Sequence, residues 1–300
     1  MITVLGSINM DLIATTERLP QPGETVAGSS FATAAGGKGA NQALAARRAG
    51  SAVHMVGAVG EDGFAAPALA LLDDANVDLS AVARVTDPTG TALILVGGTG
   101  ENMIAVVAGA NGTVSAAQAE AAVDAMKTGD ILMLQLEIPA EAVEAALNAA
   151  RAKSVLTVIN TAPLTGDAAR LARLGDIVVA NETEFELLAG SPIPDAAARQ
   201  EMLKKLHAET GQIFVVTLGG DGVVAIRDGE IVTAEGLKIE PVDTVGAGDT
   251  LCGYLAASLE QGLDFAKALR RAAVAGSLAC LLSRGAQPSI PPAEAVDARV

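Results

Sequence analysis

The segment best suited to chemistry runs from Asp243 to Thr250, reads DTVGAGDT, and precedes an apolar run compatible with a helix, Leu251 to Leu259. Two glycines allow a tight loop whose backbone N–H groups point inward at a helix start. These amides, together with the helix dipole, bind anionic oxygen. Asp249 inside this anion hole could accept the proton of an attacking hydroxyl while a phosphoryl group is transferred. On spacing alone, Asp249 could equally cap the helix.

The N-terminal part of the chain carries a second glycine-rich segment, GGKGANQA, at residues 36–43. Its glycines let the backbone approach a polyhydroxylated ligand closely, while Lys38 and Asn41 supply donors and an acceptor suited to hydroxyl groups. The segment is not a Walker phosphate loop, because that loop needs Gly at the position of Ala32 and Ser or Thr at the position of Gly39. We therefore interpret it as a loop that binds hydroxyl groups.

The elements that must position these segments alternate between apolar strands and Ala-rich helices. The pattern predicts strands at residues 2–5, 53–59, 131–136, 155–160 and 177–180. It predicts helices at residues 40–49, which Gly50 ends, and 140–151. This rhythm predicts an α/β fold with a doubly wound, mostly parallel sheet covered by helices on both faces. At 300 residues, without a low-complexity linker, we expect a single domain over 1–300.

Two stretches interrupt this rhythm, at about residues 12–34 and 89–108. Both favour short strands around Gly and Pro turns, and the second predicts a hairpin with strands at 91–96 and 103–108. Extra strands beside a doubly wound sheet could form a small β-sheet lid that excludes water from a ligand. An ordinary edge hairpin is the alternative that the pattern leaves open.

The composition excludes several classes of protein. A formal charge of −15, from 35 acidic and 20 basic residues, argues against binding to nucleic acid or to an anionic membrane. Charge-free apolar stretches such as 272–282 are shorter than the roughly 18 residues of a spanning helix, so we expect a soluble chain. Cys252 and Cys280 form no CxxC pair, and residues 1–6 do not resemble a signal peptide. A reducing cytoplasm fits these features.

The two glycine-rich segments resemble the two signatures of the ribokinase family of carbohydrate kinases, also called PfkB-type kinases. Further matches follow in family order over about residues 2–290. The resemblance implies a three-layer αβα sandwich with a central, mostly parallel sheet and a β-sheet lid. It also implies an ATP-dependent carbohydrate kinase that transfers the γ-phosphate of ATP to the 5-hydroxyl of D-ribose. In that activity, Asp249 is the general base, and the anion hole consists of Gly246, Ala247 and Gly248.

The resemblance also assigns ligands residue by residue. To the sugar it assigns Asn9, Asp11, Gly37, Lys38, Asn41, Glu137 and Asp249. To the nucleotide it assigns Asn181, Glu184, Thr217, Gly219, Gly220, Asp221, Gly222 and Gly248. Glu184 is expected to hold Mg²⁺ through water, since Mg²⁺ prefers oxygen ligands and keeps most of its water. To a potassium ion it assigns Asp243, Val245, Cys280, Ser283, Gly285 and Ser289.

Simpler interpretations remain open for several of these residues. Asp11 could cap a helix or turn, the pair Asn181 and Glu184 fits a capping pattern that can coexist with metal binding, and 217–222 could be a plain β-turn. His54 and His207 match no motif and are expected to be structural.

The function also has open alternatives. The acceptor could instead be deoxyribose, a nucleoside or another sugar, including a hexose phosphate. A catalytically silent sugar-binding or regulatory protein is the alternative from another class. Finally, exposed edge strands in the lid, together with the resemblance, predict a homodimer joined through the lids.

Overall fold

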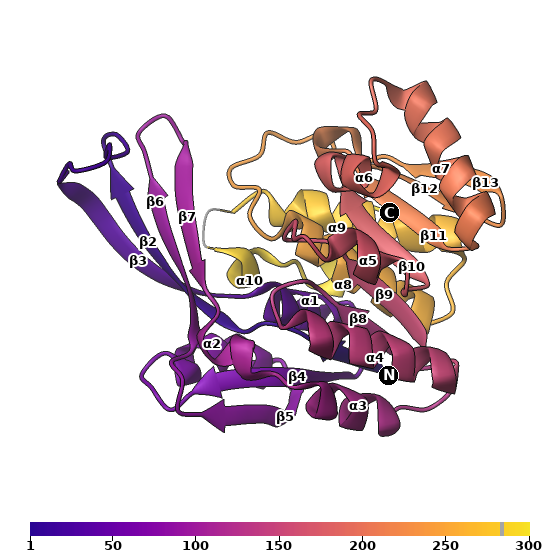
Figure 1. The fold of residues 1–300 in the computed structure, drawn as a ribbon. Coiled ribbons are helices and arrows are strands. Elements are labelled where there is room, and N and C mark those ends of the chain that lie inside the picture. Colours follow the sequence, from indigo (N-terminus) through magenta and orange to yellow (C-terminus); the bar gives the residue numbers. More distant parts are fainter. Residues whose placement is uncertain (283–284) are drawn as a thin grey trace.

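The computed structural model describes residues 1–282 and 285–300. Within them, the main sheet has nine strands in the order β13-β12-β11-β10-β9-β8-β1-β4-β5 (Figure 1). These strands are β1 (Ile2–Leu5), β4 (Val53–Gly60), β5 (Asp78–Val85), β8 (Ile131–Leu134), β9 (Leu156–Asn160), β10 (Ile177–Asn181), β11 (Ile213–Thr217), β12 (Val223–Arg227) and β13 (Glu230–Ala234). All neighbouring strands from β5 to β11 run parallel, whereas β12 and β13 pair antiparallel at one edge.

The strands are apolar throughout because both faces of the sheet are buried. Along β8, Ile131 and Met133 belong to one hydrophobic core, and Leu132 and Leu134 belong to the other. This alternation follows from the two-residue period of a strand. The two cores therefore lie on opposite faces of one sheet, and each needs its own layer of helices.

Four helices cover the first face and five cover the second among the described residues. The first set is α1 (Lys38–Arg48), α2 (Ala65–Asp74), α8 (Ala247–Glu260) and α9 (Phe265–Ala279). The second set is α3 (Ala116–Asp124), α4 (Ala140–Lys153), α5 (Ala168–Ala172), α6 (Glu182–Ala189) and α7 (Ala196–Thr210). The short helices are η1 (Gly109–Thr113), η2 (Gly219–Asp221), α10 (Ala286–Ser289) and α11 (Ala293–Asp297). The predicted three-layer αβα architecture is confirmed.

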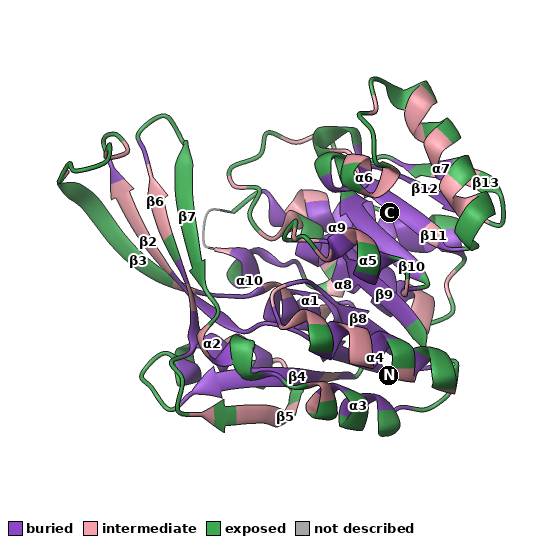
Figure 2. Cartoon of the chain, viewed as in Figure 1, coloured by how far each residue is buried: buried purple, intermediate pink, exposed green. Residues whose placement is uncertain are grey.

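A separate four-stranded sheet projects from the body (Figure 1). Its order is β3-β2-β6-β7, with β2 (Asn9–Thr16), β3 (Gly28–Gly36), β6 (Gly90–Val96) and β7 (Asn102–Val107). The hairpins β2–β3 and β6–β7 are antiparallel, but β2 and β6 run parallel where the hairpins meet. The two predicted interruptions of the sequence rhythm therefore form one sheet, which we call the lid. Figure 2 shows β3 and β7 as largely exposed.

The order of strands shows where the direction of winding reverses in the main sheet. After β1, the chain passes through α1 and adds β4 and then β5 on one side of β1. From β8 onward, it adds strands on the other side of β1, so the direction in which the sheet grows reverses between β1 and β8. Open α/β sheets bind ligands at the carboxyl ends of the strands where this direction reverses. The glycine-rich segment at 36–43 leads into α1, beside this point.

The strand predicted at 131–136 ends at Leu134, and the helix predicted at 40–49 begins at Lys38. As a result, the predicted ligand Lys38 is the first residue of α1, and the predicted ligand Glu137 lies after the end of β8. In residues 1–282 and 285–300, no helix is long and apolar enough to cross a membrane.

Candidate active site

Asp249 lies in the first turn of α8, and the N-cap of this helix is Gly246 rather than Asp249. Gly246 adopts φ +79°, and a Cβ there would lie 2.6 Å from the Cβ of Ala286, so this position requires glycine. The Asp249 carboxylate is buried and accepts hydrogen bonds from two amides, Asn41 Nδ2 at 2.9 Å and Gln42 Nε2 at 3.0 Å. The alternative that Asp249 caps the helix is therefore wrong.

Small residues bring α1 and α8 close enough for these bonds. A Cβ on Gly253 would lie 2.4 Å from the Cβ of Ala45 and 2.7 Å from the carbonyl oxygen of Gln42. Backbone atoms cannot move aside as a flexible side chain can, so the close packing of the two helices depends on this glycine. The short distance between the helices lets the amides of α1 reach the carboxylate of α8.

Glu137 lies just beyond β8 and fixes the start of α1. Its Oε2 accepts hydrogen bonds from Ser7 Oγ at 2.5 Å and from the backbone N–H of Lys38 at 3.0 Å. Acidic groups on three elements raise the pKa of the half-buried Lys38 ammonium, with Asp249 contributing most, followed by Glu137 and Glu184, while desolvation acts against them. Lys38 is therefore held as a cation among carboxylates.

Asp11 points from β2 into the same cluster. Gly36 of β3 lies against it so closely that a Cβ there would be 2.5 Å from both carboxylate oxygens. Burial raises the pKa of Asp11 to about 6, with smaller contributions from the negative charges of Glu137 and Asp249. A buried carboxylate with this pKa indicates a binding site more than a turn cap.

Asn9, the other predicted ligand on β2, is held by a residue that the sequence motifs did not reveal. Asn111 in η1 is buried, and its Nδ2 donates to Asn9 Oδ1 at 2.7 Å. The same Asn111 side chain exchanges hydrogen bonds with the backbone N–H and carbonyl of Ile8, at 2.9 and 3.2 Å. The Asn9 amide is therefore oriented with its oxygen engaged, which leaves its N–H₂ group to donate elsewhere.

Two adjoining cavities meet at this cluster. The smaller, about 220 Å³, is lined by residues that include Lys38, Asn160, Glu184 and Asp249. The larger, about 810 Å³, opens beside it. Four residues line both cavities: Asn181, Thr217, Thr244 and Gly248. Asp249 thus lies in the small cavity, next to the residues that join it to the large one.

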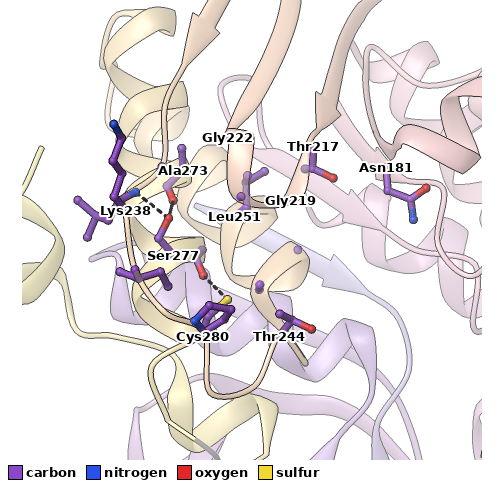
Figure 3. Close-up of a pocket in the computed structure, with 18 of the residues that line it drawn as sticks. Asn181, Thr217, Gly219, Gly222, Lys238, Thr244, Leu251, Ala273, Ser277 and Cys280 are labelled. Atoms are coloured by element: carbon purple, nitrogen blue, oxygen red, sulfur yellow. Dashed lines mark hydrogen bonds between the residues drawn. The ribbon is translucent and has the colours of Figure 1, made fainter. Parts of the chain in front are cut away.

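The large cavity contains most of the predicted nucleotide turn. Thr217, Gly219, Gly220 and Gly222 line it, whereas Asp221 is exposed and is not among its lining residues. Figure 3 shows Asn181 and Thr217 on one side of the cavity and Ala273 and Ser277 of α9 on the other. The opposite wall is made by α9 and by residues 236–241, and no motif in the sequence marked residues 236–241.

The predicted capping pattern at the start of α6 is confirmed. Asn181 Oδ1 accepts from the backbone N–H of Glu184 at 2.8 Å, and Glu184 Oε2 accepts from the backbone N–H of Asn181 at 3.0 Å. Thr161 Oγ1 donates to Glu184 Oε2 at 3.1 Å as well. Glu184 is thereby buried at the edge of the small cavity with its carboxylate fixed.

The residues predicted for potassium come together only in part. The Cys280 carbonyl accepts hydrogen bonds from the backbone N–H groups of Val242 and Asp243, at 2.8 and 3.2 Å. An Asp243 carboxylate oxygen accepts from the N–H of Val245 at 3.0 Å. Ser283 lies outside the described residues. The two other predicted ligands, Gly285 and Ser289, flank and end the short helix α10.

His54 and His207 lie away from the cavities, on β4 and α7. His207 Nδ1 lies 2.7 Å from the carbonyl of Gln212, and its Nε2 accepts from the N–H of Gly229. Among the described residues, no cluster of three or more His, Cys, Asp or Glu side chains is suited to hold a metal ion.

The fold is that of an α/β protein in which a buried carboxylate, Asp249, lies beside two joined cavities of different size. The pfkB family carbohydrate kinase profile matches residues 1–293, and the chain belongs to this family of ATP-dependent kinases. It is 33% identical to a ribokinase of Haemophilus influenzae over 97% of this chain and 95% of that protein.

Two further relatives differ in the sugar that their names give, ribose and deoxyribose. The structure of an Arabidopsis thaliana ribokinase complexed with ribose and ATP is similar with a TM-score of 0.86, at 32% identity over 99% of this chain and 97% of that one. A deoxyribokinase of Salmonella typhi is also 32% identical, over 98% of this chain and 96% of that protein.

Proposed function

We propose that this protein transfers the γ-phosphate of ATP to the 5-hydroxyl of D-ribose, giving D-ribose 5-phosphate and ADP. One observation supports this most directly: the Asp249 carboxylate is held by two amides in a small polar cavity that adjoins a nucleotide-sized one. The similarity to ribokinases over nearly the whole chain supports ribose as the acceptor.

The sugar would occupy the space among Asn9, Asp11, Lys38, Asn41 and Glu137. Asp11 and Glu137 supply acceptors for hydroxyl groups, while Lys38 and the N–H₂ group of Asn9 supply donors. Asn41 donates to Asp249, and its own Oδ1 is buried without a partner among the described residues. A sugar hydroxyl would satisfy this oxygen. Gly37, with φ +87°, would let the backbone approach the sugar.

The nucleotide would occupy the large cavity. Thr217 and the turn at 219–222 would approach it from the ends of β11 and β12, and Asn181 would approach the phosphates. Leu251, Ala273 and Ser277 form a largely apolar wall suited to a flat base. Asp221, which is exposed in the turn, would contribute through the turn's shape rather than through its side chain.

In the reaction, Asp249 takes the proton of the 5-hydroxyl as its oxygen attacks the γ-phosphorus. The bond between this phosphorus and the bridging oxygen to the β-phosphate breaks, and ADP leaves. The N–H groups of Gly246, Ala247 and Gly248, at the start of α8, would stabilise the growing negative charge, because first-turn amides lack acceptors within their own helix. The Ala247 N–H donates to the carbonyl of Thr244 at 3.3 Å, so a phosphate oxygen would compete with that bond. A Cβ on Gly248 would meet no atom within 4 Å, which leaves room for phosphate oxygens.

Magnesium fits this site. Glu184 is buried at the junction with its carboxylate held in place, and Asn181 lies beside it on the wall of both cavities. These two residues would hold Mg²⁺ through its waters, and the bound ion would neutralise charge on the phosphates.

Potassium would lie beside the anion hole, held by Asp243, Ser289 and backbone oxygens of Val245, Cys280 and Gly285. The donor set fits in chemistry, since one carboxylate with carbonyl oxygens suits a monovalent cation. The Cys280 carbonyl already accepts two hydrogen bonds, so an ion there would compete with them. Replacing KCl by NaCl at equal ionic strength should lower kcat, and equal rates would contradict this assignment.

The test of the proposed function is ADP release with Mg²⁺-ATP and potassium across four acceptors: D-ribose, 2-deoxyribose, fructose 6-phosphate and adenosine. We expect the largest kcat/KM with ribose. A preference for 2-deoxyribose, which the similarity to a deoxyribokinase makes the second candidate, would keep the mechanism and change the substrate. Release that no acceptor accelerates would instead favour a silent binding protein.

Two lids would join in a homodimer. Phe31, Met103, Ile104 and Val106 are 69%, 52%, 54% and 57% exposed on the edge strands β3 and β7. The strand register places Phe31 and Met103 on one face of the lid and Ile104 and Val106 on the other, so both faces of this small sheet carry exposed apolar side chains. A second copy of the chain fits this surface, because lid strands carry both the apolar side chains and free edges. A monomeric mass in light scattering at micromolar concentration would contradict this proposal.

The cell compartment would be the cytoplasm. Cys252 and Cys280 are both free and buried, which fits a reducing environment, and ATP is available there. Fractionation of cells that express the chain at its natural level should recover it with cytoplasmic markers.

A further inference from the structure

A chain of buried side-chain amides lies behind Asp249. Gln42 Nε2 donates to Asp249 Oδ1 at 3.0 Å and lies 3.3 Å from Asn160 Oδ1. Gln135 Nε2 donates to Gln42 Oε1 at 2.7 Å, and Asn160 Nδ2 donates to the carbonyl of Val179 at 3.2 Å. These amides come from α1, from the residue just after β8 and from β9. Gln135 and Asn160 both contact Gln42, which alone of the three contacts the carboxylate.

The hydrogen-bond partners of Gln42 allow only one of the two orientations of its side-chain amide. If Gln42 turned its oxygen toward Asp249, a carbonyl would face a carboxylate, which is repulsive. Gln135 donates to this oxygen from the opposite side, and Asn160 accepts from the second N–H of Gln42, since its own nitrogen is engaged by Val179. Gln42 is thereby fixed with both N–H groups and its oxygen in use.

A contribution to the stability of the fold does not explain why residue 135 is a glutamine. Its side chain is fully buried, and its Oε1 has no partner among the described residues. A buried, unsatisfied carbonyl destabilises a fold, and an apolar side chain of similar shape would avoid that loss. The bond that Gln135 does make serves to orient Gln42.

We propose that Gln42 is a positioning residue that fixes the Asp249 carboxylate for attack, and that Gln135 acts on the reaction only through Gln42. The proposal rests on the proposed function of Asp249 as the base. Asn41 and Gln42 each donate to a different oxygen of the carboxylate, so together they prevent its rotation. A general base works only when its lone pair faces the proton, and small misplacements lower the rate strongly.

The experiment is a double-mutant cycle with Gln42→Met and Gln135→Met, measured with the acceptor that the wild-type protein turns over best. Q42M should lower kcat about 10- to 100-fold, with the KM for the sugar changed less than about threefold. Q135M should lower kcat by less, about three- to tenfold. The double variant should match Q42M within about twofold, because Gln135 has nothing left to orient.

The matched control is Gln212→Met. Gln212 is also buried, and its Nε2 donates to two backbone carbonyls, those of Ala172 and Gly175. It precedes β11 at the end of the strand opposite Thr217, and none of these three residues lines either cavity. Q212M loses two buried amide hydrogen bonds, against three in Q42M and one in Q135M. It should lower the melting temperature, but its kcat should equal that of the wild type.

Three results would overturn the proposal: an unchanged kcat in folded Q42M, effects of Q42M and Q135M that multiply in the double variant, or an equal loss of kcat in Q212M. If Q42M does not fold, Q135M decides alone, and an unchanged kcat in that variant overturns it. A wild-type protein that releases no ADP with any acceptor would refute the proposed function instead, which separates the two failures.

Discussion

The body of the molecule and its lid use apolar residues in opposite ways. In the main sheet they are buried on both faces, and the polar residues at its carboxyl edge are held by several hydrogen bonds each. In the lid, apolar side chains such as Phe31 and Val106 remain exposed. The proposed base therefore lies in the densely packed body, whereas two of the proposed sugar ligands, Asn9 and Asp11, belong to a strand of a sheet that has little core of its own.

The two regions meet on β2, which begins beside the main sheet at Asn9 and continues into the lid. Asn9 and Asp11 are buried, while the outer part of the lid is exposed. A ligand that contacts both Asp249 and Asp11 would link the rigid part to the less packed part. We therefore expect substitutions in the body to affect catalysis and substitutions in the outer lid to affect association.

The largest effect is expected in the body, from Asp249→Asn. Loss of the general base should lower kcat by about 10²- to 10⁴-fold. Binding of the sugar, measured by calorimetry in the absence of ATP, should change much less, because Asn keeps the shape of the side chain. A variant with wild-type turnover would remove Asp249 from this role.

Asp11→Asn tests the residue that joins both regions. It should raise the KM for the sugar about 10- to 100-fold, since a hydrogen bond to a charged group contributes about 1.5–3 kcal/mol. It should also stabilise the free protein at neutral pH by about 1–3 kcal/mol, because the buried charge is removed.

The raised pKa of Asp11 determines how its contribution to the free energy of unfolding changes with pH. Asp11 has a pKa of about 6 in the folded protein against 3.8 as the ordinary value, so the folded state binds this proton more tightly. The free energy of unfolding attributable to Asp11 therefore falls as the pH rises from about 4 to 6 and stays low above about 7. Melting temperatures of D11N and wild type should differ more at pH 8 than at pH 4.5. A pH-independent difference, like that expected for Glu120→Gln at an exposed site, would contradict the assignment.

Gly253→Ala tests whether the packing of α1 on α8 positions the base. The new Cβ would force the helices apart and lower the free energy of unfolding by about 1–3 kcal/mol. It should also lower kcat, since Asn41 and Gln42 would move away from Asp249. Gly63→Ala is the control, because a Cβ there meets no atom within 4 Å and φ is not positive. A destabilised G253A with normal kcat would show that the site tolerates this shift.

The smallest effect on the single chain is expected in the lid, from Val106→Asp. Val106 is 57% exposed, so the free energy of unfolding of a monomer should change by less than about 0.5 kcal/mol. If lids associate, light scattering should show that the variant dissociates at concentrations where the wild type is dimeric. If the wild type is a monomer at every concentration, Val106→Asp will leave its mass unchanged, and the proposed dimer is wrong.

The sequence predicted the architecture well because strands buried on both faces leave a strong apolar signal. The tight glycine turn that opens α8 was also predicted, because glycine readily adopts the left-handed conformation found at Gly246. The anion hole at this turn stays a prediction. The partners of the site residues were harder to predict. Gln42 follows the predicted ligand Asn41 and Asn111 follows the lid, but no spacing shows which carboxylate or amide they face. Such pairs depend on helix packing, which connects residues more than 100 positions apart.

The parallel pairing of β2 with β6 was not predicted either. Each hairpin has its own turn signals, but the contact between hairpins depends on how the main sheet places their first residues, Asn9 and Gly90. Residues 236–241, which form part of the wall of the large cavity, also belong to no motif that could have predicted them.

The position of the base along the chain has a consequence for synthesis on the ribosome. β1 is an interior strand of the main sheet, and the proposed sugar ligands Asn9 and Asp11 are made almost at once. Asp249 is translated long afterwards, in a helix that must still pack on α1. A nascent chain that lacks this helix would have a sugar-facing edge without its base. The kinase would therefore acquire activity only when translation is nearly finished.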